Sequence, residues 1–374
     1  MSDDDIPEAD RLPGAPHPRE TARVFGHGAA EAAFLDAYAS GRLHHAWLIA
    51  GPKGVGKATL AWRLARFLLA QPPDEGGGLF GAPEPPATLD VAPDHPVARR
   101  VAALSEPRLF LLRRPWDEKT KKLKTEITVD ATRRLKEFFA LSAAEGGRRV
   151  VIVDAADEMN RSAANALLKL LEEPPERATL LLIAHSPARL LPTIRSRCRI
   201  LRLRPLPAPD LAEALAQAGA EPVEGPTAPS LAALADGSVG AAFQLIESDG
   251  LAFYGGLVRL FTAAPGIDRP AAIALAQEPG PEGFPLALHL TEMFLARLAR
   301  AGITGPPEPE AVPGEAAALA RLSPDAAAAR AWAAVAQEAG ERARHGFAVN
   351  LDPAALLLDM FLRVDGAARQ PAPA

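Results

Sequence analysis

A glycine-rich run with one lysine at its end is the part of this sequence best suited to hold phosphate. Residues 51–57 read Gly-Pro-Lys-Gly-Val-Gly-Lys and fit the first seven positions of the eight-residue P-loop pattern. An apolar run precedes them and a helical pattern follows, so backbone N–H groups and a helix N-terminus would converge on phosphate oxygens. Lys57 would reach the terminal phosphates. The predicted nucleotide-binding residues of this loop are Gly51, Gly54, Val55, Gly56, Lys57, Ala58 and Thr59.

The eighth position of the loop lacks the side chain that binds magnesium. The pattern requires Ser or Thr there, because the hydroxyl ligates Mg²⁺, and this chain has Ala58. Thr59 is adjacent, but one residue along a helix turns the side chain by about 100°. The sequence therefore leaves the binding of ATP or ADP open and predicts that the metal for hydrolysis is not positioned.

A second motif of an ATPase site is incomplete in the same way. The strongest strand pattern, residues 149–154, ends in Asp154, which we assign to the nucleotide site. In P-loop ATPases a Glu often follows this Asp and orients the attacking water, whereas Ala155 cannot accept a proton. We interpret Asp157 and Glu158 as helix-entry and surface carboxylates, not as substitutes. The two losses together predict a catalytically silent site.

An arginine between Ser196 and Cys198 is the third candidate for chemistry. At this place Arg197 could be an arginine finger, which stabilises charge on the transferred phosphoryl group in a neighbouring subunit. A solvated or phosphate-contacting arginine is the alternative. Cys198 is the only cysteine, so the chain has no intrachain disulfide and no cysteine cluster for zinc. We expect it to be packed, not nucleophilic.

The elements that would position these residues alternate along the first half of the chain. Helical patterns separate apolar runs, which predicts a parallel α/β sheet with both faces covered. After residue 205 only Ala-rich helical patterns remain. The expected strands lie at residues 46–50, 109–114, 149–154, 179–184 and 200–203. The expected organisation is a disordered acidic lead over 1–20, a P-loop domain over 21–205, a helical lid over 206–248 and an all-α domain over 249–370.

Composition and charge narrow the function classes. The chain has 374 residues and a net charge of −5, which disfavours a surface that grips nucleic acid throughout. Two basic clusters, within residues 113–124 and 195–204, are interpreted as solvated faces, with steering of phosphate as the alternative. The acidic N-terminus is unlike a signal peptide, and no apolar window has the length of a membrane span. We expect a cytoplasmic protein.

The chain resembles the bacterial clamp-loader ATPases of the AAA+ class, which serve DNA polymerase III. The resemblance rests on Leu-Leu-Lys-Leu-Leu-Glu-Glu-Pro-Pro at residues 167–175 and on Ser-Arg-Cys at 196–198, placed after a P-loop and an Asp-ended strand at the family's spacing. Residues 44–48 and 237–242 narrow the match to a subunit that does not hydrolyse ATP. The resemblance covers roughly residues 22–250, and the C-terminal domain fits mainly by size and helicity.

The resemblance implies a place in a pentameric ring with gamma/tau and delta subunits. Such a ring acts on the sliding clamp and primer–template DNA, within a polymerase holoenzyme that is a nucleotidyltransferase. Arg197 would be the finger for a neighbouring gamma/tau ATP site, with Ser196 and Cys198 completing the motif. Gly240 would replace a nucleotide-sensing arginine of active relatives. The last domain would form a collar.

Two alternative functions remain open for this sequence, and the zinc module found in many clamp-loader relatives is absent from it. An active gamma/tau-like or helicase-loader ATPase is disfavoured by Ala58, Ala155 and Gly240. A DNA-binding module that uses the basic clusters is disfavoured by the net charge. Many relatives carry a four-cysteine zinc module, whereas this chain has a Pro/Gly-rich stretch at residues 71–93, so no zinc is expected.

Overall fold

The computed structural model describes residues 7–72, 86–140, 147–221, 223 and 227–369. The chain divides into two compact units. The first comprises Met1–Glu221 with Gly237–Gly240, and the second comprises Pro222–Asp236 with Ala241–Ala374. No helix in the described part of the chain is both long and apolar enough to cross a membrane.

A five-stranded parallel sheet forms the centre of the first unit. Its strands run in the order β2-β5-β6-β1-β7, so β6 lies between the strand that leads into the phosphate loop and the strand that ends in Asp154. This confirms the predicted parallel α/β fold. The strands are β1 (Ala46–Ala50), β2 (Leu109–Arg113), β5 (Arg149–Asp154), β6 (Ala178–Ala184) and β7 (Arg199–Arg202).

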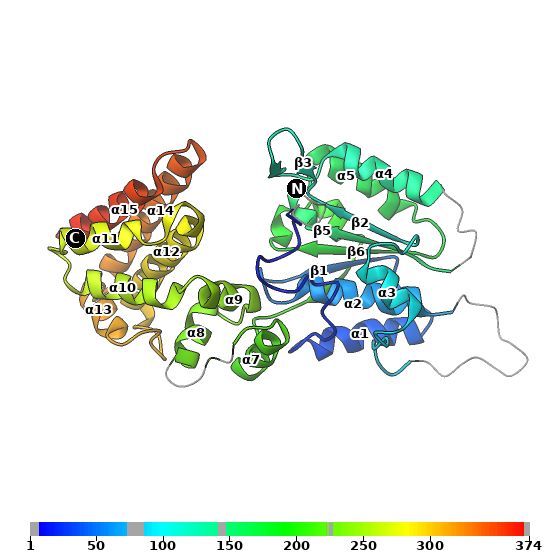
Figure 1. Ribbon diagram of the computed structural model, residues 1–374, viewed down its shortest axis with the longest axis horizontal. Helices are drawn as coiled ribbons and strands as arrows, with labels where there is room; N and C mark the ends of the chain where they lie inside the picture. The colour runs from blue at the N-terminus through cyan, green and yellow to red at the C-terminus, as the bar shows by residue number, and fades with distance from the viewer. Residues whose placement is uncertain (1–6, 73–85, 141–146, 222, 224–226, 370–374) are drawn as a thin grey trace, which may run out of the picture. The chain divides into compact units, whose positions relative to one another are not determined.

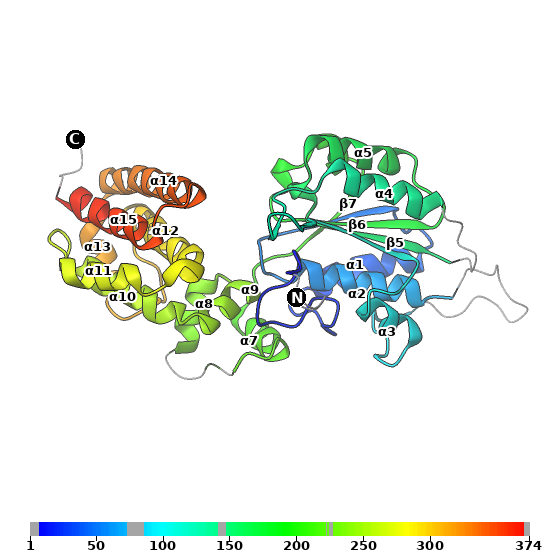
Figure 2. The same cartoon turned by 45° about the horizontal axis from the view of Figure 1, so that its top comes forward.

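Helices cover both faces of this sheet (Figures 1 and 2). On one face lie α1 (Gly28–Ala39), α2 (Lys57–Ala70) and α3 (Pro96–Ala102); on the other lie α4 (Val129–Ala140) and α5 (Arg161–Glu172). Asn160 begins α5 by accepting a hydrogen bond from the amide of Ala163 at 2.9 Å. The small helix α7 (Ala208–Gln217) completes the unit.

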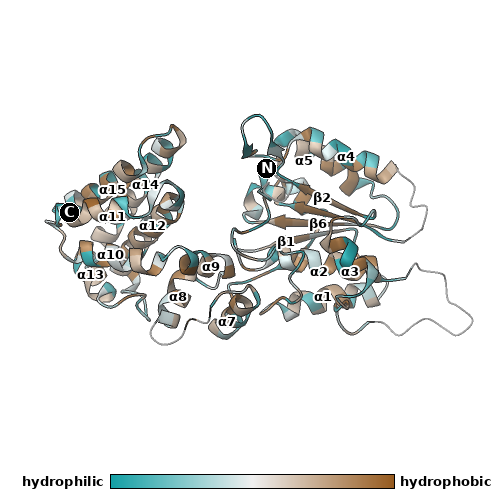
Figure 3. Cartoon of the chain, in the orientation of Figure 1, coloured by the Kyte–Doolittle hydropathy of each residue, from teal (hydrophilic) through white to brown (hydrophobic). Residues whose placement is uncertain are grey.

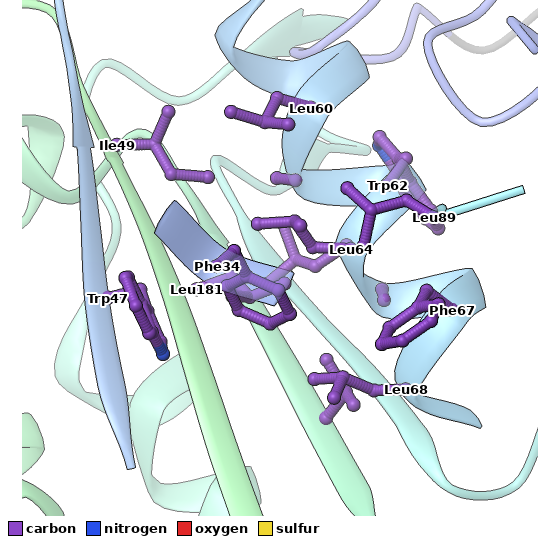
Figure 4. Close-up of a cluster of buried hydrophobic side chains, with 14 of the residues drawn as sticks. Phe34, Trp47, Ile49, Leu60, Trp62, Leu64, Phe67, Leu68, Leu89 and Leu181 are labelled. Carbon is purple, nitrogen blue, oxygen red and sulfur yellow. The ribbon is translucent and has the colours of Figure 1, made fainter. Parts of the chain in front are cut away.

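Continuous apolar runs form the central strands because water reaches neither face. Every residue of β1 and β6 is buried, and these strands are mostly brown in Figure 3. Figure 4 shows the larger of the two cores, in which Phe34 of α1 and Leu64 of α2 lie against Trp47 and Leu181 of the sheet. Burial of each such side chain contributes roughly 1.5–3 kcal/mol.

The described part of the second unit is entirely helical. The helix α9 (Val239–Glu247) begins in the first unit and continues in the second. Tyr254, Phe261, Phe294 and Phe361 are fully buried in its core, with the rings of Phe261 and Phe294 stacked at 5.1 Å. The other helices are α8 (Thr227–Ala235), α10 (Gly250–Thr262), α11 (Arg269–Gln277), α12 (Gly280–Thr304), α13 (Glu315–Leu322), α14 (Ala326–Ala348) and α15 (Pro353–Ala368).

The N-terminal segment departs from the sequence-based expectation. We predicted disorder over residues 1–20; residues 1–6 lie outside the described part, and the prediction is wrong for residues 7–20. The side chains of Asp10 and His17 are fully buried and lie 3.2 Å apart. Arg113, at the end of β2, pairs with Asp10 and with Glu8 at 2.9 Å. Long-range ion pairs hold this segment, and a local pattern cannot reveal them.

Local patterns missed three smaller features. A short hairpin, β3 (Trp116–Asp117) with β4 (Lys122–Leu123), lies inside the first basic cluster, where no strand was expected. The helix α3 was not predicted either. The helical pattern of the sequence from Val24 to Ser40 predicts a helix there, and the helix of the structure begins later, at Gly28. Most of the Pro/Gly-rich stretch at 71–93 lies outside the described residues.

Candidate nucleotide site and arginine finger

The phosphate loop lies where the sequence places it, between β1 and α2. Gly54 and Gly56 have φ angles of 78° and 98°, a left-handed conformation that glycine adopts without strain. Val55 is buried, and its carbonyl lies 2.7 Å from Nε2 of His27. The backbone therefore has the turn that a phosphate cradle requires.

The loop itself engages the lysine that should meet phosphate. Nζ of Lys57 donates to the carbonyl oxygen of Gly51 at 2.8 Å and also to that of Pro52. The residue is only 3% exposed. Burial lowers the pKa of Lys57 to about 8, although the charges of Asp154 and Asp157 act in the opposite direction. A phosphate would have to compete with two carbonyl groups for this ammonium.

The start of α9 packs directly on the loop. Oγ of Ser238 donates to the carbonyl of Lys53 at 2.9 Å, and the amide of Gly240 donates to the carbonyl of Gly54 at 3.1 Å. A Cβ on Gly54 would collide with Oγ of Ser238, and one on Gly240 would lie 3.1 Å from the Cα of Gly54. The predicted sensor position thus holds a glycine, which allows this close approach.

The two alanines occupy the positions where a metal ligand and a general base were sought. Ala58, in the first turn of α2, packs against the core beneath the loop, with Thr59 beside it. Ala155 is 2% exposed and follows Asp154 directly. Neither methyl group can bind a metal or accept a proton.

Asp154 is a buried carboxyl group with unusual electrostatics. Burial raises its pKa to about 7, and the negative charges of Asp10 and Glu158 act in the same direction. Lys57 and Arg113 only partly offset these effects. The protonated form of Asp154 is therefore favoured more than is usual for an aspartate.

The two later carboxylates have structural partners. Asp157 accepts hydrogen bonds from the backbone amides of His185 and Ser186, at 3.1 and 2.8 Å, and so fixes the segment after β6. Glu158 pairs with Arg114 at 2.6 Å. These contacts agree with the interpretation that neither residue replaces the missing Glu.

Sequence patterns did not single out His185, which directly follows β6 at the edge of the sheet that holds the loop. Burial and then the charge of Lys57 lower the pKa of His185 to about 4, so its ring is neutral. Its Nδ1 is buried without a hydrogen-bond partner among the described residues. The available signal was its position at the carboxyl end of a central parallel strand.

The candidate finger lies on the surface, after the short helix α6 (Pro192–Arg195). The side chain of Arg197 is 37% exposed; Nη2 pairs with Oε1 of Glu172 at 2.9 Å and Nη1 donates to the carbonyl of Thr193 at 3.1 Å. Oγ of Ser196 donates to the same carbonyl at 3.1 Å. The structure gives Arg197 no contact with the phosphate loop within the described residues.

Cys198 packs against the second core cluster, and burial raises the pKa of its thiol to about 12. The thiol is therefore protonated at neutral pH and is not a nucleophile. The described residues hold no cluster of His, Cys, Asp and Glu that could bind a metal ion.

The comparisons with known proteins concern the part of the chain that carries these motifs. Residues 26–207 match the family model described as "DNA polymerase III, delta subunit". The chain is 41% identical to DNA polymerase III subunit delta' of Pseudomonas aeruginosa over 163 residues, 44% of each protein. It is 35% identical to the subunit delta' of Escherichia coli over 178 residues, which is 46% of this chain and 45% of that protein.

A gamma/tau subunit is also similar. DNA polymerase III subunit gamma/tau of Mycobacterium tuberculosis is 33% identical over 191 residues, 51% of this chain and 29% of that protein. The chain thus spans less than half the length of the curated relatives named above. Their similarity, together with the P-loop, the Asp-ended strand and the Ser-Arg-Cys motif, shows that residues 26–207 belong to the clamp-loader family of DNA polymerase III delta-type subunits.

Proposed function

We propose that this chain is a clamp-loader subunit of the delta-prime type, which does not hydrolyse ATP and donates Arg197 to the ATP site of a neighbouring gamma/tau subunit. Homology of the P-loop half to delta-prime and gamma/tau subunits supports this assignment. The partners of the whole chain are part of the proposal: gamma/tau and delta subunits, the sliding clamp and primer–template DNA. In this assembly residues 206–248 act as a lid and 249–370 as a collar.

The hydrogen bonds between Lys57 and its own loop are the main evidence that this chain does not hydrolyse ATP. ATP or ADP entering this loop has to displace the carbonyls of Gly51 and Pro52 from Nζ. The loop has no hydroxyl for Mg²⁺ and no carboxylate beside Asp154 to orient water, and hydrolysis depends on both. Loss of three functions in one site supports a subunit that does not turn over nucleotide.

The surroundings of Arg197 support the second part of the proposal, that this side chain acts in the ATP site of a neighbouring subunit. A planar guanidinium with a fixed donor geometry suits a phosphoryl group under transfer. Glu172 and the carbonyl of Thr193 hold the side chain at the surface, where a subunit in a ring can reach it. The pair with Glu172 is partly exposed, so exchange of that partner for phosphate costs little.

Reconstitution of the loader with gamma/tau and delta subunits tests the finger. Arg197→Ala should reduce DNA-stimulated ATPase by about 10³ while ring assembly, measured by size-exclusion chromatography, is unchanged. Arg195→Ala is the matched control, because Arg195 lies two residues away and has no ion pair within the described residues. If the loaders with Arg197→Ala and Arg195→Ala have the same ATPase rate, Arg197 is not the arginine finger. Steady ATP turnover by the purified chain alone would instead favour an active ATPase.

A further inference from the structure

The strand β2 forms one edge of the central sheet, and part of its backbone has no partner. Val150 donates its amide to the carbonyl of Arg108 at 2.9 Å, which fixes which residues of β2 face β5. Along a strand of a parallel sheet, successive residues point their backbone N–H and C=O groups alternately toward one neighbouring strand and toward the other. The carbonyl of Arg108 points toward β5, so the N–H and C=O of Leu111, three residues later, point away from β5. No other strand or loop among the described residues bonds to them. The edge can therefore accept one more extended chain.

A groove runs along this edge. It encloses about 450 Å³ and is bounded by β2, by α4, by the β3–β4 hairpin and by the N-terminal segment. Figure 1 shows the hairpin and the start of the described chain beside β2. Its apolar lining comes from Phe110 and Leu112 of the strand, Trp116 and Leu123 of the hairpin and Ala131 of α4. These side chains form a surface that an apolar side chain of an added strand can contact.

The groove is positively charged, which favours an acidic ligand. Five arginines but only one carboxylate, Glu8, line it: Arg11, Arg19, Arg113, Arg114 and Arg134. Glu8 pairs with Arg19 at 2.8 Å and with Arg113 at 2.9 Å, and Arg114 pairs with Glu158. Arg11 and Arg134 form no ion pair within the described part of the chain, so the groove keeps uncompensated positive charge.

We propose that this groove binds an extended acidic peptide segment of a partner protein, which adds as a strand to the free edge of β2. The outward N–H and C=O of Leu111 would pair with the peptide backbone, Arg11 and Arg134 would meet its carboxylates, and the aromatic lining would take one apolar side chain. The unpaired amide and carbonyl of Leu111 favour a polypeptide over single-stranded DNA, because a nucleic-acid backbone offers no N–H donor to pair with the carbonyl. The proposal does not depend on the state of the nucleotide site.

Fluorescence anisotropy with the full chain tests this interaction. The probe is a fluorescein-labelled twelve-residue peptide of alternating Asp and Val with one central Phe, and its counterpart has Lys in place of Asp. We expect the acidic probe to bind with Kd below about 1 mM, more weakly as salt rises, and the basic probe not to bind. No binding of the acidic probe, or equal binding of both, would overturn the proposal.

Two pairs of variants locate the site. Leu111→Pro removes the outward amide at an edge position, where proline is tolerated, and Leu111→Ala truncates the side chain but keeps the amide. We expect about tenfold weaker binding for the proline variant than for the alanine variant. Arg134→Glu should weaken binding about tenfold or more, while Lys136→Glu, on exposed α4 surface outside the groove, should leave it unchanged.

Competition and self-association distinguish the other occupants. Displacement of the acidic probe by an oligo(dT) strand that binds more tightly, with the same loss in Arg134→Glu, would assign the groove to nucleic acid and overturn the peptide proposal. Concentration-dependent dimerisation that Leu111→Pro abolishes would assign it to a second copy of this chain and also overturn the proposal. Circular dichroism melts that match those of the unmodified chain show that each variant is folded.

Discussion

The amide of Gly240 donates a hydrogen bond to the carbonyl of Gly54, with 3.1 Å between nitrogen and oxygen. Through this bond the first turn of α9 lies on the phosphate loop, and Ser238 adds a second bond to Lys53. The shape of the loop and the position of residues 238–240 are therefore coupled. Since neither glycine has a Cβ, the contact tolerates almost no added volume.

The first prediction concerns this contact. Gly240→Ala should lower the free energy of unfolding of the first unit by about 1 kcal/mol, because the new Cβ would lie 3.1 Å from the Cα of Gly54 and the backbone must shift. Gly28→Ala makes the same change at the start of α1, where nothing lies within 4 Å, and should cost nothing. Urea titration followed by circular dichroism measures both. Equal stabilities would show that α9 moves freely on the loop.

The second prediction concerns the missing catalytic groups. Restoring them with Ala58→Thr and Ala155→Glu should not produce steady ATP turnover by the purified chain, because Lys57 stays bound to the carbonyls of Gly51 and Pro52. A coupled ATPase assay checks this, with the unmodified chain as control. Under the proposed function, the double variant and the unmodified chain should support clamp loading equally in the reconstituted loader. Turnover by the double variant would mean that the loop opens readily for nucleotide.

The third prediction is the pH dependence that Asp154 imposes. Its pKa is raised from 3.8 to about 7, so between these values the folded state binds more protons than the unfolded state. The contribution of this group to stability is thus present at low pH and is lost as pH rises towards 7. Asp154→Asn removes the dependence, so the variant should gain stability relative to the unmodified chain by on the order of 3 kcal/mol between pH 4 and 7.

Chemical denaturation at several pH values measures this difference. Asp130→Asn removes an exposed carboxylate of α4 and controls for the loss of one charge. A gap between Asp154→Asn and the unmodified chain that stays constant over this pH range would show that Asp154 is ionised throughout. Lys57 acts in a different window: its lowered pKa makes stability rise with pH from about 8 upward.

The fourth prediction concerns a buried ion pair in the second unit. Glu315, fully buried, accepts hydrogen bonds from Arg297 at 2.7 and 3.1 Å, from Tyr254 at 2.6 Å and from the amide of Ala311 at 2.7 Å. Glu315→Ala leaves the Arg297 charge buried and unpaired and should destabilise this unit by about 3–5 kcal/mol. The double variant Arg297→Met/Glu315→Leu should lose less than the single variant, because no unpaired charge remains.

Thermal unfolding of Arg297→Met, Glu315→Leu and the double variant gives the coupling free energy. Glu310→Ala, which removes a carboxylate bonded to an exposed amide of α13, is the control and should change stability by less than about 1 kcal/mol. Additive effects of the two substitutions would show that Arg297 finds another partner. Arg297 also donates to the carbonyl of Ala233 at 3.3 Å, so loss of the cluster should increase hydrogen exchange in α8.

Local sequence patterns correctly predicted the central strands and the turn of the phosphate loop. Continuous apolar runs predicted the buried strands, and the glycine spacing predicted the turn at Gly54 and Gly56. Patterns failed where distant charges decide the structure. Arg113 was assigned to a solvated basic cluster, but its carboxylate partners lie 103 and 105 residues earlier. The bond from Lys57 to its own loop was equally invisible, because the P-loop pattern describes the loop with phosphate present.

The folded N-terminal segment has a consequence for how this protein is handled. Asp10 contributes to the raised pKa of Asp154, and Arg113, which pairs with Asp10, lies opposite Asp154 in the register of β2 and β5. Shortening the chain to Val24, where helical periodicity begins, would therefore remove the counter-charges of Arg113 and change the electrostatics of a site encoded more than a hundred residues later. A domain that begins at residue 26, where the family match begins, would therefore have altered electrostatics around Asp154 and the phosphate loop.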